Sequence, residues 1–313
     1  MGKAGEMTTS DRPDDRGAGQ RPLTESLHPL AERLDSMTTS ELVAAMNLED
    51  RTVAEVVGTQ LLPIARVVEE AVTRLKGGGG IHYFGAGTSG RLAVLDAAEC
   101  PPTFGVPAEL VQAHLAGFPE AVLASVEGAE DDVGMGERDA CASVTKRDVA
   151  IGLAASGTTP YVRAAVRAAR GAGAWTAAIA CTAGSPLAAE VDQAIELPVG
   201  PEILAGSTRL KAGTAQKLTL NMISTGTFWR LGHVYRGRMV DVRPSNAKLR
   251  SRAAEIVSEL TGREPSTAAA ALAEGGRIKT AVVMLELALD RAGAERRLHE
   301  VGDDLASALA GPA

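Results

Sequence analysis

The sequence predicts an α/β protein: a doubly wound parallel sheet with helices on both faces (an αβα sandwich), N-terminal helices and a small C-terminal helical domain. Three observations support this fold class. Short apolar runs alternate with segments of helical periodicity in the middle of the chain, which is typical of βαβ units. Apolar residues recur at three- and four-residue spacing before this region. After about residue 236, strand-like runs no longer occur.

Five apolar runs are the expected strands of the sheet. They cover residues 81–84, 108–113, 148–155, 175–181 and 194–199. Helices are expected over 208–231 and then over 246–258, 265–273, 277–290 and 293–310. Strands joined by helices run parallel, so their carboxyl ends meet at one edge of the sheet, where such proteins bind ligands.

The same patterns divide the chain into four segments. Residues 1–25 are polar, charged and rich in Gly and Pro, which predicts a disordered tail. Residues 26–76 are the N-terminal helical segment, 77–236 the α/β domain and 237–313 the C-terminal helical domain. Ligand binding is therefore expected in the central segment.

Composition excludes several classes of function. The chain has 313 residues, 45% of them hydrophobic, which is enough for one large domain or two ordinary ones. A formal charge of −7 and 3% aromatic residues argue against nucleic acid as a partner. No apolar run has membrane-spanning length and the N-terminus lacks a signal-peptide pattern, so no membrane partner is expected. The three widely spaced cysteines and five scattered histidines form neither a disulfide framework nor a metal pattern, and they indicate a cytoplasmic protein.

Three turns next to expected strand ends combine glycine with Ser or Thr. They are GAGTSG at 85–90, ASGTTP at 155–160 and AGSTRLKAGT at 205–214. Backbone N–H groups at a helix start, together with hydroxyl groups, suit the three terminal oxygens of a phosphate monoester. The third turn adds Arg209 and Lys211, cations that suit a phosphate or an interface ion pair. A single such turn is most simply a helix cap, but three at one sheet edge favour a shared phosphate site.

A dinucleotide site is the alternative for the first turn. Gly85, Gly87 and Gly90 match G-x-G-x-x-G after a strand, a pattern that is weak by itself. The acid that should end the second strand is missing, because Gln112 and His114 stand there. A pyrophosphate would also leave the other hydroxyl turns unexplained, so this alternative is disfavoured.

Glu99 is a candidate catalytic acid. It follows an apolar stretch and precedes Cys100-Pro101-Pro102, and Pro101 disfavours helix at Cys100, so the helix is expected to end near Glu99. A carboxylate at a helix C-terminus faces the negative end of the dipole, which raises its pKa and suits a general acid. An exposed loop glutamate is an equally good interpretation on these grounds.

A second acidic cluster is SVEGAEDD at 125–132. Glu127 and Glu130 are three residues apart and would share one face of a helix, for which a solvated acidic surface is the simpler interpretation. Cys100 has no histidine base near it in the sequence, so a buried structural role is favoured over a nucleophile.

Taken in order, four stretches resemble a known family. GAGTSGRLAVLDAAECPPTFG, VEGAEDD, AASGTTPYV and GSTRLKAGTAQKLTLNMISTG closely resemble the N-acetylmuramic acid 6-phosphate etherases, bacterial lyases with a sugar isomerase (SIS) domain. The resemblance covers the chain from about residue 23 onward, and a bare SIS domain lacks the ECPPTFG and KAGTAQK blocks. It implies a SIS-type sandwich, a sugar-phosphate substrate and a homodimer. The implied activity is cleavage of the D-lactyl ether during peptidoglycan recycling, without a metal or other cofactor.

The resemblance also implies roles for particular residues. Glu99 would be the acid at the leaving lactate and Glu130 the base at C2, while Glu127 keeps its simpler interpretation. The implied phosphate-binding residues are Thr88, Ser89, Ser156, Thr159, Ser207 and Lys211. The second turn matches only the later half of the SIS motif S-x-S-G-x-T, because Ala154 replaces its first serine. One hydroxyl donor is therefore missing.

Two other functions remain open at this level. A non-catalytic sugar-phosphate sensor, like the related glucokinase regulatory protein, would use the phosphate turns but not the two glutamates. An aldose–ketose isomerase acting on an amino-sugar phosphate would also need proton transfer at C2.

Overall fold

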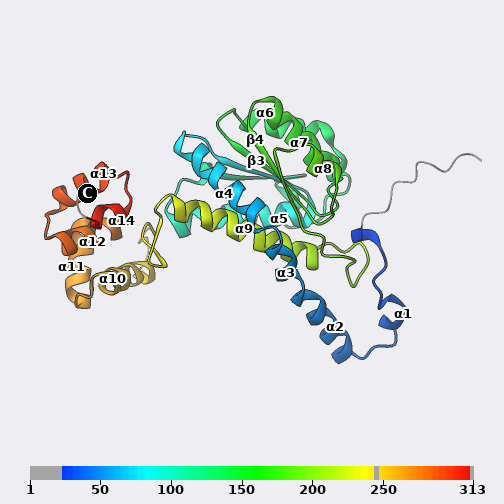
Figure 1. The fold of residues 1–313 in the computed structure, drawn as a ribbon, viewed down its shortest axis with the longest axis horizontal. Coiled ribbons are helices and arrows are strands. Elements are labelled where there is room, and N and C mark those ends of the chain that lie inside the picture. Colours follow the sequence, from blue (N-terminus) through cyan, green and yellow to red (C-terminus); the bar gives the residue numbers. More distant parts are fainter. Residues whose placement is uncertain (1–22, 243–246, 311–313) are drawn as a thin grey trace, which may run out of the picture.

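The computed structural model describes residues 23–242 and 247–310 and confirms the predicted sandwich (Figure 1). Its central sheet is parallel, with the strand order β2-β1-β3-β4-β5 among the described residues. The strands are β1 (Ile81–Gly85), β2 (Val111–Leu115), β3 (Val149–Ala154), β4 (Trp175–Ala180) and β5 (Gln193–Glu196). The predicted tail lies outside the described residues except for Leu23–Glu25, a short 3₁₀ helix.

Helices cover both faces of the sheet. Helices α4, α5 and α9 pack together on one face, and α6, α7 and α8 lie on the other (Figure 1). Their bounds are α4 Leu61–Lys76, α5 Gly87–Phe104, α6 Val133–Ser143, α7 Pro160–Gly171, α8 Pro186–Ala189 and α9 Lys211–Arg230. The segment before α4 folds as α1 (Ala31–Leu34), α2 (Thr39–Arg51) and α3 (Val53–Gly58).

The central strand β3 shows why these residues form a buried sheet. All six of its residues are buried, as a strand covered on both faces requires. Ile151 and Leu153 belong to the core beneath α4, α5 and α9, whereas Gly152 faces α7. A Cβ at Gly152 would come within 2.9 Å of both Val162 and Val166, so the missing side chain lets α7 lie close to the sheet.

The end of α5 corrects the prediction that this helix stops near Glu99. The helix continues through Pro101 and Pro102 to Phe104 and ends at Gly105, whose left-handed backbone donates an N–H to the Pro101 carbonyl. Phe104 is buried and stacks on Phe228 of α9 with ring centroids 4.6 Å apart. This packing of the last turn outweighs the two hydrogen bonds that the prolines remove. The dipole argument for Glu99 therefore no longer applies.

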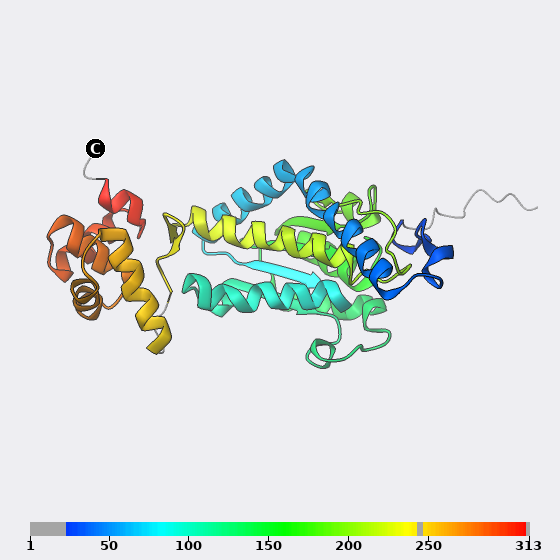
Figure 2. The same ribbon diagram turned by 90° about the horizontal axis from the view of Figure 1, so that it is seen from below.

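The C-terminal helical domain has its own core and lies beyond the C-termini of α5 and α9 (Figures 1 and 2). Its helices are α10 (Ala247–Thr261), α11 (Pro265–Gly275), α12 (Ile278–Leu287), α13 (Arg291–Glu300) and α14 (Leu305–Leu309). The predicted helix over 293–310 is divided, because Gly302 and Asp303 adopt positive φ. A hairpin of two short antiparallel strands precedes the domain: β6 (Val234–Tyr235) and β7 (Arg238–Met239). It was not expected from the sequence.

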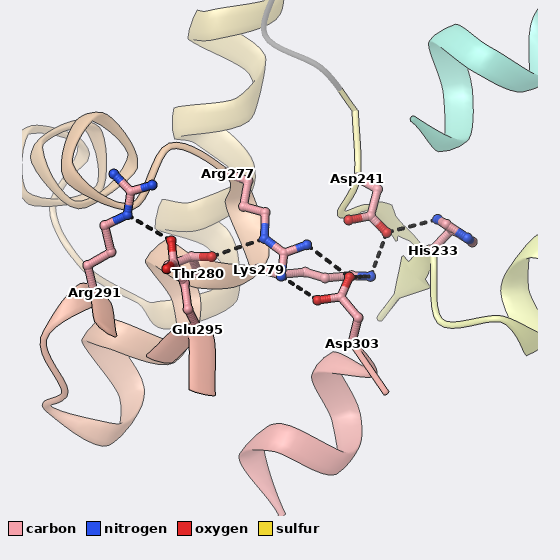
Figure 3. A network of polar contacts seen from close by, with 8 residues as sticks. All are labelled: His233, Asp241, Arg277, Lys279, Thr280, Arg291, Glu295 and Asp303. Atoms are coloured by element: carbon pink, nitrogen blue, oxygen red, sulfur yellow. Dashed lines mark hydrogen bonds and ion pairs between the residues drawn. The ribbon is translucent and has the colours of Figure 1, made fainter. Parts of the chain in front are cut away.

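A charged network joins this domain to the sandwich (Figure 3). The Lys279 ammonium, 1% exposed, lies 2.5 Å from Asp241 and 3.1 Å from Asp303. Asp241 also lies 2.9 Å from the Nδ1 of His233, just beyond α9, and Arg277 pairs with Asp303. Each carboxylate of this group therefore faces at least one cation.

Candidate active site

The three hydroxyl turns meet at the carboxyl ends of the strands around a cavity of about 350 Å³. We call it the hydroxyl cavity. Hydroxyl groups line it from each turn: Thr88 and Ser89, then Ser156, Thr158 and Thr159, and then Thr208. The sequence thus correctly predicted that the turns share one edge. Four of the six predicted phosphate-binding residues, Thr88, Ser89, Ser156 and Thr159, line the same cavity.

Helices α5 and α7 both begin at the hydroxyl cavity. In neither does the residue before the first turn, Ala86 or Thr159, accept a backbone hydrogen bond with its side chain. Their N-terminal N–H groups therefore keep their donor capacity, and both helix dipoles place positive potential at the cavity. No Lys or Arg of the described residues lines it, while Glu25, Glu130 and Asp131 do. An anion would thus be bound by hydroxyl and backbone donors.

The glycine spacing of the first turn has a packing reason. A Cβ on Gly85 would lie 2.6 Å from the backbone nitrogen of Gly90, and one on Gly90 would lie 2.7 Å from the Gly85 carbonyl oxygen. The end of β1 and the first turn of α5 are therefore in backbone contact, which only glycine allows at both positions. G-x-G-x-x-G is here a device for close strand–helix packing.

Hydrogen bonds hold the hydroxyl groups of two turns in place. The buried Ser89 hydroxyl donates to Oε1 of Gln216 on α9 at 2.9 Å. The Ser156 hydroxyl lies 2.8 Å from that of Thr158 and accepts the Thr158 N–H. Ser89 is thus fixed by a helix far away in the sequence, and Ser156 by its own turn.

Glu130 lies at the border of two cavities. It belongs to a single 3₁₀ turn, Ala129–Asp131, which begins after the left-handed Gly128. Its side chain lines the hydroxyl cavity and also a neighbouring cavity of about 320 Å³, and the two cavities share Ala86, Gly87 and Glu130. A ligand that fills both would therefore pass this carboxylate.

Arg91 lines the neighbouring cavity, which we call the arginine cavity. The side chain extends from α5 toward the connection between β2 and α6, which projects beside the start of α5 in Figure 2. Its Nε donates to the Val122 carbonyl at 3.2 Å and its Nη2 to the Ala124 carbonyl at 2.8 Å. Ala116, Ala121 and Val126 form the apolar part of the remaining wall, and Ser125 and Glu127 add polar groups.

Glu99 lies apart from both cavities. It is twelve residues beyond Gly87 on α5, about 18 Å along the helix axis. It lines a groove between α5 and α9, the Glu99 groove, with Asp96, Lys217 and Asn221. Burial raises the pKa of Asp96, whose carboxylate accepts hydrogen bonds from Tyr83 and Ser224. One chain therefore does not bring Glu99 and Glu130 into a common pocket.

Ser207 and Lys211, the other predicted phosphate-binding residues, do not line the hydroxyl cavity. Lys211 is buried, and its ammonium lies 2.6 Å from the Glu49 carboxylate on α2. Its backbone N–H donates to the buried Glu202 side chain, which also accepts the N–H of Ala212. The N-terminus of α9 is thus already occupied by a carboxylate, unlike those of α5 and α7.

Sequence reasoning missed Arg91, Gln216, Thr208 and Glu25 as residues of this site. Arg91 directly follows GAGTSG, so a cation one residue past a glycine turn was an available signal. Gln216 carried no local signal, because its contact with Ser89 spans 127 residues. Cys100 is buried as predicted, and burial raises its pKa to about 12, against a nucleophilic role.

Comparison with known proteins identifies the family. The N-terminal SIS domain of glucokinase regulatory protein matches residues 63–170, and the SIS domain family matches residues 129–225. The N-acetylmuramic acid 6-phosphate etherase of Serratia proteamaculans is 52% identical over 92% of this chain and 97% of its own length. That of a Geobacillus strain is 46% identical over 93% of this chain and 99% of its own. The chain belongs to the N-acetylmuramic acid 6-phosphate etherase family.

A solved structure supports the fold. A phosphoheptose isomerase from Francisella tularensis matches with a TM-score of 0.50 at 16% identity and covers 62% of this chain and all of its own. Among the described residues, no cluster of His, Cys, Asp or Glu forms a metal site. Within the same part of the chain, no helix has the length and apolarity needed to cross a membrane.

Proposed function

We propose that this protein cleaves the D-lactyl ether of N-acetylmuramic acid 6-phosphate, giving N-acetylglucosamine 6-phosphate and D-lactate. Identity near 50% over almost the whole chain to etherases of several bacteria is the observation that carries this. It favours the etherase over a non-catalytic sensor. The expected role is in cell-wall amino-sugar recycling, and the free cysteines agree with a cytoplasmic location.

The hydroxyl cavity is the proposed phosphate site. The N–H groups of α5 and α7 and the hydroxyls of Thr88, Ser156 and Thr159 would bind the phosphate oxygens, and Ser89 would join them by turning its proton from Gln216 to the phosphate. Thr208 supplies a hydroxyl from the third turn in place of Ser207. Lys211, held by Glu49, would support the turn rather than contact the ligand.

Glu130 is the proposed base at C2. In the open-chain sugar the C1 aldehyde acidifies the C2 hydrogen, and lactate leaves from C3. A phosphate at C6 in the hydroxyl cavity would direct C2 and C3 toward Glu130, at the border with the arginine cavity. Loss of the C2 proton expels lactate as its oxygen is protonated, and water then adds at C3 while a proton returns to C2. Glu99 is the proposed group that protonates lactate and activates this water.

Because Glu99 lies in a separate groove, we propose that a second copy of the chain delivers it. A homodimer would place Glu99 of each copy at the cavities of the other. Exposed apolar side chains near the Glu99 groove and near the arginine cavity support such a contact. Leu95 is 44% exposed in the Glu99 groove, and Phe118 and Leu123 are 64% and 96% exposed on the connection between β2 and α6.

Mixing two inactive variants tests the function and the dimer together. Wild type should release D-lactate, while Glu99→Gln and Glu130→Gln should each lose roughly 10²–10⁴-fold in rate. A refolded equimolar mixture should regain about one quarter of wild-type activity, because half of its dimers carry one intact site. Glu137→Gln, at an exposed glutamate of α6 that lines neither cavity nor the Glu99 groove, is the control and should stay near wild type.

Each outcome has its own meaning. If folded wild-type protein releases no lactate, the proposed etherase activity is wrong. Active wild type with a mixture that stays inactive would show that one chain supplies both glutamates to each site.

A further inference from the structure

We infer that Arg91 binds the carboxylate of the lactyl group and that the arginine cavity is the subsite for this part of the substrate. The inference rests on the proposed function. It assigns a specificity-determining residue that neither the turns nor the two glutamates explain.

The substrate has two anionic groups, and the site has two places that suit an anion. The substrate carries a phosphate on C6 and a carboxylate on the ether group at C3. The hydroxyl cavity offers neutral donors and two helix N-termini, which suit the phosphate. The arginine cavity offers a guanidinium, the one cationic side chain that lines either cavity among the described residues.

The geometry orders the two groups along one ligand. Both cavities share Ala86, Gly87 and Glu130. With the phosphate in the hydroxyl cavity and C2 beside Glu130, the substituents of C2 and C3 continue into the arginine cavity. The apolar side chains of Ala116, Ala121 and Val126 suit the methyl groups of the acetamido and lactyl substituents, and Arg91 suits the lactyl carboxylate.

Arg91 has donor capacity left for a ligand. Two of its five N–H groups reach the carbonyls of Val122 and Ala124, which fixes the side chain in the cavity wall. Its hydrogen-bond partners among the described residues are carbonyl groups and no carboxylate, although Glu127 and Glu130 line the same cavity. A half-buried arginine held by carbonyls and unpaired with an acid is prepared to bind an external carboxylate.

The experiment compares three ligands in Arg91→Gln and Arg91→Lys. They are N-acetylmuramic acid 6-phosphate, the same compound with the lactyl carboxyl as an amide, and N-acetylglucosamine 6-phosphate, which lacks the lactyl group. Wild type should favour the carboxylate over the amide by roughly 10- to 100-fold in kcat/KM, as expected for a charge-assisted hydrogen bond. Arg91→Gln should lose this preference, and Arg91→Lys should keep part of it.

Binding at equilibrium separates this inference from the proposed function. It is measured in the Glu130→Gln protein, so the result stands whether or not the protein releases lactate. Adding Arg91→Gln should raise the dissociation constant of N-acetylmuramic acid 6-phosphate about 10-fold or more. It should change the dissociation constant of N-acetylglucosamine 6-phosphate less than about threefold. Arg66→Gln, an exposed arginine outside both cavities, is the matched control.

Two results would overturn the assignment. Equal weakening of all three ligands would mean that Arg91 serves the phosphate or merely fastens the connection after β2. Unchanged preference for the carboxylate in Arg91→Gln would place the lactyl group elsewhere.

Discussion

The carboxyl edge of the sheet and the junction with the C-terminal domain use polar groups in opposite ways. At the edge, neutral hydroxyls and two uncapped helix N-termini surround a cavity without a lining Lys or Arg among the described residues. At the junction, Lys279, Asp241 and Asp303 meet in ion pairs around a buried ammonium (Figure 3). The first region leaves donors available for a ligand, and the second pairs its charges within the chain.

The contrast follows from the energetics of buried charge. An unpaired buried ion costs several kcal/mol, so a permanent junction must pair its charges. A binding site must exist empty as well as occupied. Neutral donors at an exposed cavity are solvated when empty and bind an anion when it arrives, so they serve both states. The two regions should therefore differ in which property a substitution changes.

The largest effect on stability is expected at the junction. Lys279→Ala removes the closest cation from the largely buried Asp241, which should lower the free energy of unfolding by about 3 to 5 kcal/mol. Urea denaturation followed by circular dichroism measures this. Arg291→Ala, which breaks the exposed pair with Glu295, is the control and should cost less than about 1 kcal/mol. Similar values for both would remove the contrast between buried and exposed pairs.

An intermediate effect is expected from a buried pair that is uncharged, His82 and His114. Their Nδ1 and Nε2 atoms lie 3.2 Å apart, and His114 stacks on Phe84. Burial lowers the pKa of His82 and lowers that of His114 from 6.5 to about 4, with repulsion from His82 as a further cause for His114. Both rings are therefore neutral in the folded protein near neutral pH.

Acid should weaken the fold through this pair. Because the folded-state pKa of His114 lies below the unfolded value of 6.5, the unfolded chain binds the proton first. Protonation of this group should lower the free energy of unfolding by about 2 to 3 kcal/mol between pH 6.5 and 4 and lower it little further below pH 4. Urea denaturation at several pH values measures this, and the free energy of unfolding should depend less steeply on pH in His114→Gln than in wild type. An unchanged slope would place the acid sensitivity in other groups.

The smallest effect on stability is expected at the hydroxyl cavity. Ser156→Ala removes one hydroxyl whose hydrogen bonds lie within its own turn. The free energy of unfolding should therefore change by less than about 0.5 kcal/mol. Binding of N-acetylglucosamine 6-phosphate should weaken roughly 3- to 10-fold, as measured by calorimetry. Ser251→Ala on α10 is the control. If Ser156→Ala lowered the free energy of unfolding but left ligand binding unchanged, the expected difference between the two regions would be wrong.

The predicted sheet and turns agree with the structure because their signals are local. Five apolar runs became five parallel strands, since a strand buried on both faces must be apolar throughout. The second strand begins later than predicted, at Val111, because a 3₁₀ turn occupies Ala108–Leu110 after Pro107. The hydroxyl turns met at one edge because parallel strands bring their carboxyl ends together.

The interpretation of α5 shows the limit of local signals. Pro101 predicted a helix end near Glu99, but burial of Phe104 against Phe228 carried the helix onward to Gly105. A propensity of a few kcal/mol is outweighed by aromatic packing that the sequence does not display. The same holds for Lys211, whose pairing with Glu49 depends on a helix 162 residues away.

The sequence by itself determined the sandwich, its order of elements and the three turns that meet at its edge, because periodicity and turn chemistry act between near neighbours. Only the tertiary structure decided which side chains share a cavity. It joined Glu130 to both cavities, set Arg91 in the wall of one, tied Ser89 to Gln216 and placed Glu99 in a groove of its own. Those positions depend on how whole helices pack across the sheet, which no short stretch of residues encodes.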